Sequence, residues 1–209
     1  MHVDDLGTGW TVVVPVKHRD RAKTRLSPAL ESFRSRLAHA FALDTVDVAL
    51  GCDRVSRVVV VTDDDLLPAD LPTGVEVVHD PAGGDDLDRA ALAGCAVAPD
   101  GPVAVLAADL PALLVRELDE ALMAASAHER ALVVDADGTG TTVLAARRGD
   151  GLRPSYGAGS AARHVHLGAV ALAGAWPGLR RDVDEPAHLE LLRPHLTGRR
   201  TAALLASMS

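Results

Sequence analysis

The chain is poor in aromatic residues, which make up only 2% of its 209 residues, although hydrophobic residues together reach 48%. A core made from this sequence must therefore consist mainly of valine, leucine and alanine, which pack well between helices and a sheet. The length allows one α/β domain with a full core, whereas two domains would be a tight fit.

Cysteines and long apolar runs are scarce as well. The two cysteines, Cys52 and Cys95, have neither metal-site spacing nor the number needed for a disulfide framework, which predicts reduced thiols in a cytoplasmic protein. No run approaches the roughly 20 apolar residues that cross a membrane. The first residues lack a basic segment followed by an apolar core, so we expect no signal peptide.

Positive charge is not in excess either. The net charge is −8, and basic and acidic residues are interspersed along the chain. This argues against a nucleic-acid-binding surface, which would need a basic face. A small phosphorylated ligand remains compatible with the composition, because a few local cations are enough to bind it.

Valine-rich runs alternate with amphipathic segments in the first half of the chain. This pattern predicts a doubly wound, mostly parallel α/β sheet with right-handed crossovers. The second half has shorter strands and more loops, which is typical of a substrate region built onto such a sheet. The expected strands are 10–16, 55–62, 75–79, 103–107, 132–135, 141–146 and 169–173, and the expected helices are 29–50, 87–97, one from 111, 160–167 and 186–196, followed by a loosely tied segment, 197–209.

Three acidic residues stand in two short motifs. Asp109 follows the apolar run 103–108, and Asp182 and Asp184 flank Val183 in a D-x-D pattern. A buried parallel strand delivers its last residues to the carboxyl edge of the sheet, and an extended D-x-D puts both carboxylates on one face. If the motifs meet, they form an all-oxygen site suited to magnesium. The alternative is helix capping, because a proline that could begin a helix follows each motif.

Three cations, Lys17, Lys23 and Arg25, follow the first expected strand. The loop after a first strand is a preferred position for phosphate groups. This loop contains no glycine, so its side chains rather than its amides would carry the charge, and arginine can bind phosphate through two hydrogen bonds. The alternative is an ordinary solvated basic loop.

Two segments combine glycines with hydroxyl groups, namely 138–142 and 157–160. Their amides and hydroxyls suit an anion, but the residues alone favour ordinary turn chemistry. Residues 157–162 also match the G-x-G-x-x-A fingerprint of dinucleotide-binding folds. No clean strand precedes this match and only about 50 residues follow it, so we reject a dinucleotide-binding fold.

Seven motifs in this order resemble one family over nearly the whole chain: VVVPVK, AKTRLSP, DLDRAAL, AADLPAL, DGTGTTVL, YGAGSAARH and DVDEPAHL. The family is the guanylyltransferase of deazaflavin coenzyme F-420 biosynthesis, within the nucleotidyltransferases that have a Rossmann-like sheet. The resemblance implies an enzyme with a single nucleotidyltransferase domain over residues 1–209. Its nucleotide half would span about 8–110, and its acceptor and metal half about 111–196.

The resemblance also implies the reaction. Members join GMP from GTP to a small phosphorylated three-carbon acid. The alanine-rich and valine-rich composition is similar to that of high-GC actinobacteria, in which the expected acceptor is phosphoenolpyruvate and the products are enolpyruvyl-diphospho-guanosine and pyrophosphate. The alternatives are 2-phospho-L-lactate or 3-phosphoglycerate as acceptor, or an inactive nucleotide-binding relative. A homodimer is compatible with the sequence, but no feature selects an oligomeric state.

Site residues carry over position by position. The resemblance implies Mg²⁺ on Asp109, Asp182 and Asp184, acceptor binding by Thr142, Gly157 and Ser160, and GTP phosphates on Lys17, Lys23 and Arg25 as catalytic cations. Asp88 stands where the family usually has the asparagine of a Gly-Leu-Asn motif that touches the nucleotide, and it could accept hydrogen bonds from guanine or ribose. Glu185 stands where threonine is common, and it could be an additional acid near the metal.

Overall fold

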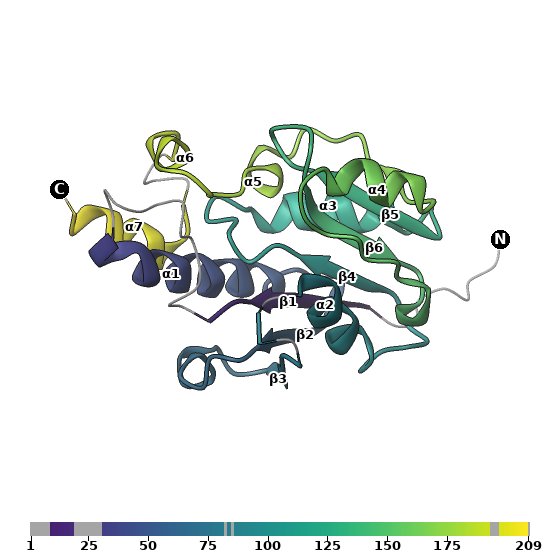
Figure 1. Cartoon of the computed structure of the whole chain (residues 1–209), viewed down its shortest axis with the longest axis horizontal. Coiled ribbons are helices and arrows are strands. Elements are labelled where there is room, and N and C mark those ends of the chain that lie inside the picture. Colours follow the sequence, from purple (N-terminus) through teal and green to yellow (C-terminus); the bar gives the residue numbers. More distant parts are fainter. Residues whose placement is uncertain (1–8, 19–30, 82, 85, 193–196, 209) are drawn as a thin grey trace.

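The structure is a computed structural model that describes residues 9–18, 31–81, 83–84, 86–192 and 197–208. Seven strands form one sheet in the order β3-β2-β1-β4-β6-β5-β7 (Figure 1). The strands are β1 (Trp10–Val16), β2 (Val55–Thr62), β3 (Val75–His79), β4 (Val103–Leu106), β5 (Arg130–Val134), β6 (Thr141–Ala146) and β7 (Val170–Ala171). The helices are α1 (Glu31–Leu50), η2 (Leu67–Asp70), α2 (Leu87–Cys95), α3 (Val115–Ala125), η3 (Gly149–Gly151), α4 (Ser160–His166), α5 (Pro177–Arg180), α6 (Pro186–Glu190) and α7 (Arg199–Ala206).

The sheet is mostly parallel, which confirms the predicted fold class. Strands β1 to β4 pair in parallel, and β5 pairs with β7 in parallel. Only β6 runs antiparallel to its neighbours β4 and β5. The amino end of β6 therefore lies beside the carboxyl end of β4, which brings residues from both halves of the chain to one edge of the sheet.

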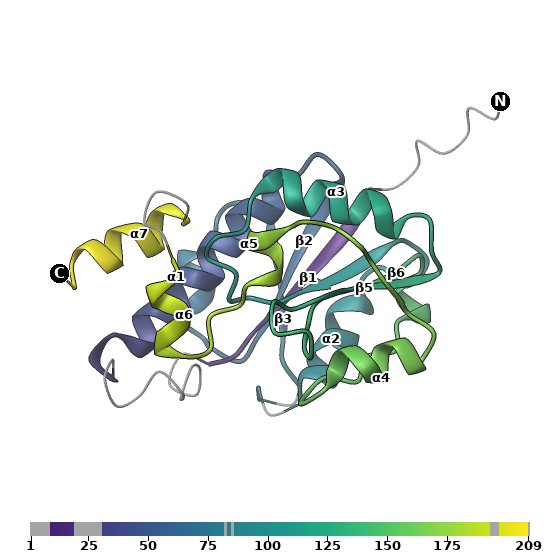
Figure 2. The same cartoon turned by 90° about the horizontal axis from the view of Figure 1, so that it is seen from above.

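The sheet is covered on both faces, as a doubly wound fold requires (Figure 2). Val12 and Val14 of β1 pack with α1 and α3, whereas the intervening Val13 packs with α2 and α4 on the opposite face. This alternation follows from the period of two in strand side chains. Because both faces are buried, the strands consist of almost uninterrupted aliphatic residues.

Helix α2 lies against the sheet at Gly94, where there is no room for a side chain. A Cβ atom at this position would come within 2.3 Å of Val13 Cγ1 and 2.8 Å of Val61 Cγ2. The glycine thus allows the helix backbone to approach β1 and β2, and small residues such as Ala90 and Ala91 complete the contact. A core with few aromatic side chains is compatible with this narrow spacing between layers.

The helix expected from Pro111 begins later than predicted. Helix α3 starts at Val115, because residues 110–113 form a separate turn in which the N–H of Leu113 donates to the carbonyl of Leu110. The N–H of Leu114 then donates to the carboxylate of Glu117, at 3.3 Å. Glu117 therefore closes the first turn of α3, and the helix starts four residues beyond the proline that suggested the start.

The expectation of a loosely tied end was wrong. Helix α7 packs alongside α1 (Figures 1 and 2), and Asp44 of α1 accepts hydrogen bonds from the backbone N–H groups of Arg200 and Thr201 at 3.1 and 2.8 Å. The N–H of Gly198 donates to the carbonyl of Pro111, at 2.7 Å. Helix α5 was also not predicted, and the strand expected at 169–173 is only the two-residue β7.

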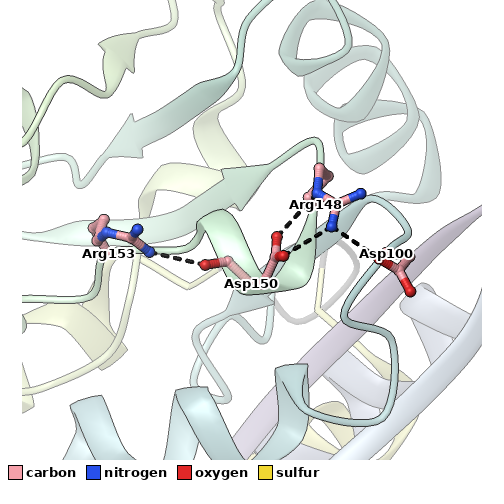
Figure 3. A network of polar contacts seen from close by, with 4 residues as sticks. All are labelled: Asp100, Arg148, Asp150 and Arg153. Carbon is pink, nitrogen blue, oxygen red and sulfur yellow. Dashed lines mark hydrogen bonds and ion pairs between the residues drawn. The ribbon is translucent and has the colours of Figure 1, made fainter.

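A surface network stabilises the loop between β6 and α4 (Figure 3). Arg148 donates to Asp150 and, across a longer sequence separation, to Asp100, with Nη2–Oδ distances of 2.8 Å. Arg153 donates to the backbone carbonyl of Asp150 at 2.9 Å. Both carboxylates raise the pKa of Arg148, and the hydrogen bonds from Arg148 lower the pKa of Asp150. The network lies at the amino edge of β4, opposite the edge to which β4 delivers Asp109.

Both cysteine side chains are buried and reduced. Burial raises the pKa of Cys95 to about 12 and also raises the pKa of Cys52. Neither thiol is therefore a nucleophile at neutral pH. None of the helices in the described part of the chain is long and apolar enough to cross a membrane.

Candidate active site at the carboxyl edge of the sheet

The structure brings the three predicted acidic ligands together. One carboxylate oxygen from each of Asp109, Asp182 and Asp184 lies within 4.8 Å of the others, and all three residues are half-buried. Asp109 follows the carboxyl end of β4, and the other two residues lie in the extended segment between α5 and α6. We call these residues the aspartate triad.

A backbone hydrogen bond joins the two motifs. The N–H of Val183 donates to the carbonyl oxygen of Asp109, at 3.1 Å. Val183 itself is fully buried against α1 and the residues around α6 and α7. Since alternate side chains of an extended segment point to opposite sides, burial of Val183 turns Asp182 and Asp184 to the same side.

The segment before the D-x-D motif is held by two charged side chains. Glu117, which is only 2% exposed, accepts a hydrogen bond from the N–H of Gly178 at 3.2 Å. Arg180 donates from Nε to the carbonyl of Val134 at 2.9 Å and from Nη2 to the carbonyl of Asp135 at 3.1 Å. These contacts tie α5 to α3 and to the end of β5, so the triad rests on three elements of the core.

The helix-capping alternative does not account for these acids. The first turn of α3 begins after Leu114 and is capped by Glu117, well beyond Asp109. Helix α6 has Glu185 and not Asp182 or Asp184 at its N-cap position, and the side chain of Glu185 does not cap it. The N–H of Asp184 instead donates to His188 Nδ1, at 3.2 Å, which fixes the turn that follows the triad.

Lys17 lies at the same edge of the sheet as Asp109. It follows β1 directly and is exposed, and β1 pairs in parallel with β4. Lys17 therefore follows the strand next to β4, the strand that leads to Asp109. Lys23 and Arg25, the other two predicted cations, lie outside the described residues.

Thr142, one of the predicted acceptor-binding residues, lies beside the end of β4. Its carbonyl accepts the N–H of Ala107 at 2.8 Å, two residues before Asp109. Its side chain is buried, and its hydroxyl donates to the carbonyl of Val133 at 3.5 Å. The antiparallel strand β6 thus joins the acceptor side of the site to the triad side.

The glycine-rich turn before Thr142 is closed by Asp135. The carboxylate of Asp135 accepts the N–H groups of Thr139 and Gly140 at 2.9 and 2.7 Å. A Cβ atom on Gly140 would come within 2.2 Å of Asp135 Oδ2, so glycine is needed there. These two amides are therefore used within the protein, which favours the turn interpretation of this segment over anion binding.

The second glycine-rich segment has a different arrangement. Residues 155–159, which we call the acceptor loop, lead into α4, and Gly157 and Gly159 have positive φ angles of 108° and 72°. Gly157 is exposed, whereas Ser160 at the start of α4 is buried. The Ser160 hydroxyl donates to Thr141 Oγ1 at 3.2 Å, and its N–H donates to the carbonyl of Gly157.

The buried side chain of His164 contacts both the start of the acceptor loop and Thr141. Its Nε2 accepts the N–H of Ser155 at 2.9 Å, and its Nδ1 lies 2.9 Å from Thr141 Oγ1. Because Nε2 is an acceptor, the neutral ring must carry its proton on Nδ1 and donate it to Thr141. Burial lowers the pKa of His164, and the charge of Arg163 lowers it further while Asp88 opposes the shift. Neutral His164 therefore fixes the hydroxyl of Thr141, which in turn fixes that of Ser160.

Asp88, predicted to bind the nucleotide, faces the acceptor loop. It lies in the first turn of α2, whose N-cap is Asp86, and its Oδ1 accepts the N–H of Tyr156 at 2.7 Å. The residue thus connects the helix that follows β3 with the loop that leads into α4. Contact with a nucleotide stays a prediction. Glu185 is exposed at the start of α6, beside Asp184.

Several supporting residues could not be recognised in the sequence. Glu117, Arg163 and Arg180 bind backbone groups that only the fold brings near them, and a charged residue has no local sequence signal for such a role. Asp135 is the exception, because an aspartate before a glycine-rich turn is a known pattern for side chain to backbone hydrogen bonds. The others became visible only through their partners.

Comparison with known protein families gives one match that covers most of the chain. The family model described as guanylyl transferase CofC-like matches residues 10–171. A phosphoenolpyruvate guanylyltransferase of Streptomyces scabiei is 48% identical over 209 residues, covering 95% of this chain and 97% of its own. Another from Geodermatophilus obscurus is 46% identical over 203 residues, covering 94% of both chains.

Solved structures agree on the fold. A Desulfovibrio desulfuricans protein described as a nucleotide-diphospho-sugar transferase superposes with a TM-score of 0.72 at 19% identity, covering 95% of this chain and 94% of its own. A 4-diphosphocytidyl-2C-methyl-D-erythritol synthase superposes with a TM-score of 0.60 at 15% identity, covering 96% and 99%. The sheet described above is therefore that of the nucleotidyltransferases.

Proposed function

Because the chain belongs to the CofC-like guanylyl transferase family, we propose that it transfers the GMP unit of GTP to phosphoenolpyruvate. The products are enolpyruvyl-diphospho-guanosine and pyrophosphate, and the reaction belongs to the biosynthesis of coenzyme F-420. The aspartate triad, gathered at the carboxyl edge of the sheet, is the observation that carries this proposal. The similarity to relatives named for the same activity extends over nearly the whole chain.

The proposed reaction is an in-line displacement at phosphorus. A phosphate oxygen of phosphoenolpyruvate forms a bond to the α-phosphorus of GTP, and the bond from that phosphorus to the bridging oxygen breaks. The electron pair leaves with pyrophosphate. The attacking oxygen is already anionic, so no general base is needed, and catalysis depends on positioning and on neutralising charge.

The triad fits a magnesium ion. It offers three carboxylates, their ligand atoms lie close enough to share one cation, and hard divalent cations prefer oxygen ligands. When bound, magnesium would supply the positive charge that offsets repulsion between the α-phosphate and the attacking phosphate. Asp109 is held by β4, and Asp182 and Asp184 by the buried Val183, so the ligands are oriented before an ion binds.

The basic residues would neutralise the negative charge of the leaving group. Lys17, with Lys23 and Arg25 from the segment that follows it, would face the phosphates of GTP and stabilise the departing pyrophosphate. Thr142, Gly157 and Ser160 would bind the phosphate and carboxylate of the acid. Asp88 would contact the nucleotide from the first turn of α2, where its carboxylate also accepts the N–H of Tyr156 in the acceptor loop.

A pyrophosphate-release assay with identified products tests this proposal. The purified chain is incubated with magnesium and GTP, and phosphoenolpyruvate, 2-phospho-L-lactate and 3-phosphoglycerate are compared as acceptors. We expect pyrophosphate and enolpyruvyl-diphospho-guanosine with phosphoenolpyruvate. Faster pyrophosphate release with another acid would identify that acid as the acceptor in place of phosphoenolpyruvate. GTP binding without any pyrophosphate release would support an inactive nucleotide-binding relative instead. ATP in place of GTP serves as the control for base choice.

A further inference from the structure

Arg163 donates hydrogen bonds to three residues of the acceptor loop. Its Nε donates to the carbonyl and hydroxyl oxygens of Ser155 at 3.1 and 3.0 Å, and its Nη2 donates to the carbonyl of Tyr156 at 2.8 Å. Its Nη1 donates to the carbonyl of Ala158. The planar guanidinium presents five donors in a fixed fork, and here that fork is used on backbone carbonyls rather than on an acid.

These contacts set the direction of the peptide groups in the loop. A trans peptide is planar, so its N–H points away from its own C=O. The carbonyls of Tyr156 and Ala158 point to Arg163, and the N–H groups of Gly157 and Gly159, in the same two peptides, therefore point away from it. Within the described part of the chain, the N–H groups of residues 157–159 donate no hydrogen bond, and these residues are exposed.

Two other side chains hold the start of the loop. Asp88 accepts the N–H of Tyr156 at 2.7 Å, and the peptide to which this N–H belongs gives its carbonyl, that of Ser155, to Arg163. His164 accepts the N–H of Ser155 at 2.9 Å. The first two amides of the loop are thus used inside the protein, and the next three are left as donors.

We propose that Arg163 is a positioning residue for the acceptor: it binds the carbonyls of Tyr156 and Ala158, so that the N–H groups of Gly157 and Gly159 face the anionic acid. The proposal rests on the proposed function, because that function assigns the acid to Gly157. Carbonyl oxygens turned toward the acid would repel it, whereas amide donors stabilise negative charge. The two glycines permit this arrangement, because both have φ angles at which a Cβ atom would be strained.

Asp88 has the complementary task. Its carboxylate on α2 accepts the N–H of the peptide between Ser155 and Tyr156, and Arg163 on α4 donates to the carbonyl of the same peptide. This peptide is therefore fixed at both ends. An asparagine at this position could accept the same hydrogen bond through its amide oxygen. The aspartate is therefore compatible with acceptor binding, and its effect is expected on the affinity for the acid.

Arg163→Lys tests the proposal directly. Lysine keeps the charge but replaces the planar fork by a single ammonium group, so it cannot hold three carbonyls in the same geometry. Binding of phosphoenolpyruvate is followed by the ¹⁵N–¹H resonances of Gly157 and Gly159, which requires no turnover. We expect both resonances to shift in the wild type on binding, and the Kd to rise about tenfold or more in Arg163→Lys, since small misplacement of binding groups has large effects.

Arg57→Lys is the matched control. Arg57 also donates to a backbone carbonyl, that of Val97 at 2.8 Å, but it lies on β2 and holds the far end of α2. It should bind phosphoenolpyruvate like the wild type. Unchanged affinity in Arg163→Lys would overturn the proposal, and so would a wild type whose Gly157 and Gly159 resonances do not respond to the acid.

A second pair of variants covers the case in which Arg163→Lys does not fold. Asp88→Ala should weaken binding of phosphoenolpyruvate, and Asp88→Asn should restore it, while the Kd for GTP changes less than that for the acid. An effect of Asp88→Ala on GTP alone would contradict the role in the acceptor loop. If the wild type binds the acid through these amides but releases no pyrophosphate, the proposed function fails while the role of Arg163 stands.

Discussion

Val183 and Asp109, which are 3.1 Å apart from backbone N to backbone O, hold the two acidic motifs together. The hydrogen bond does not involve a carboxylate, so it can persist whether or not the acids bind a ligand. It joins the end of β4 to an extended segment from the last third of the chain. The aspartate triad is therefore part of the folded framework and does not depend on a mobile side chain to assemble it.

The attachment of α7 to α1 predicts a specific loss of stability. Asp44→Ala leaves the N–H groups of Arg200 and Thr201 without acceptors at a buried helix start, and we expect a loss of about 1–3 kcal/mol in the free energy of unfolding. Urea unfolding measures it. Asp47→Ala removes the more exposed partner of Arg200 and should cost less than about 1 kcal/mol. Equal effects of the two variants would contradict the capping role.

The close approach of α2 to the sheet predicts intolerance of a single methyl group. In Gly94→Ala, the added carbon overlaps Val13 and Val61, so we expect a net loss of about 1–2 kcal/mol even though alanine favours helix. Gly101→Ala is the matched control, because nothing lies within 4 Å of its new carbon. Thermal unfolding compares the two, and a Gly94→Ala variant as stable as the wild type would show that the layers can separate without cost.

Buried His164 predicts a loss of stability on mild acidification. Its folded pKa is lowered below the usual value of about 6.5, so the unfolded chain binds a proton at higher pH than the folded protein does. The stability that it contributes is present above about pH 6.5 and is lost as the pH falls below that value. The measurement is the free energy of unfolding at pH 7.5 and 5.5.

Two histidine variants isolate this effect. His164→Gln should lose less stability between the two pH values than the wild type, because the titrating group is gone. His166→Gln, which changes an exposed histidine on the same helix, should follow the wild type. The same slope in all three proteins would show that protonation of His164 does not oppose folding.

The buried strands could be predicted from sequence because their signal is local. Runs of valine in β1, β2 and β4 are buried on both faces, and their limits differ from the expected ones by at most one residue. The place of Asp109 was likewise accessible, since an aspartate after such a strand must lie near the carboxyl edge. That Asp109 meets Asp182 and Asp184 was a hypothesis, and the structure confirms the meeting.

Elements that depend on distant partners could not be predicted. The N-terminus of helix α7 is capped by Asp44, which precedes it by more than 150 residues. The start of α3 is set by Glu117 and not by Pro111. The roles of Arg163 and Arg180 depend on carbonyls that only the tertiary structure brings near. A sequence pattern reports which residue types are present, whereas these roles depend on which backbone group each side chain reaches.

Magnesium-dependent pyrophosphate release by Asp184→Asn, with GTP and phosphoenolpyruvate, tests the proposed reaction most directly. Asparagine keeps the size of the side chain but removes one negative ligand, so we expect release to fall at least about 100-fold with little change in melting temperature. Asp53→Asn, an exposed acid between α1 and β2 at the opposite edge of the sheet, should retain the wild-type rate. A folded Asp184→Asn protein with the full magnesium-dependent rate would contradict the assignment of the triad.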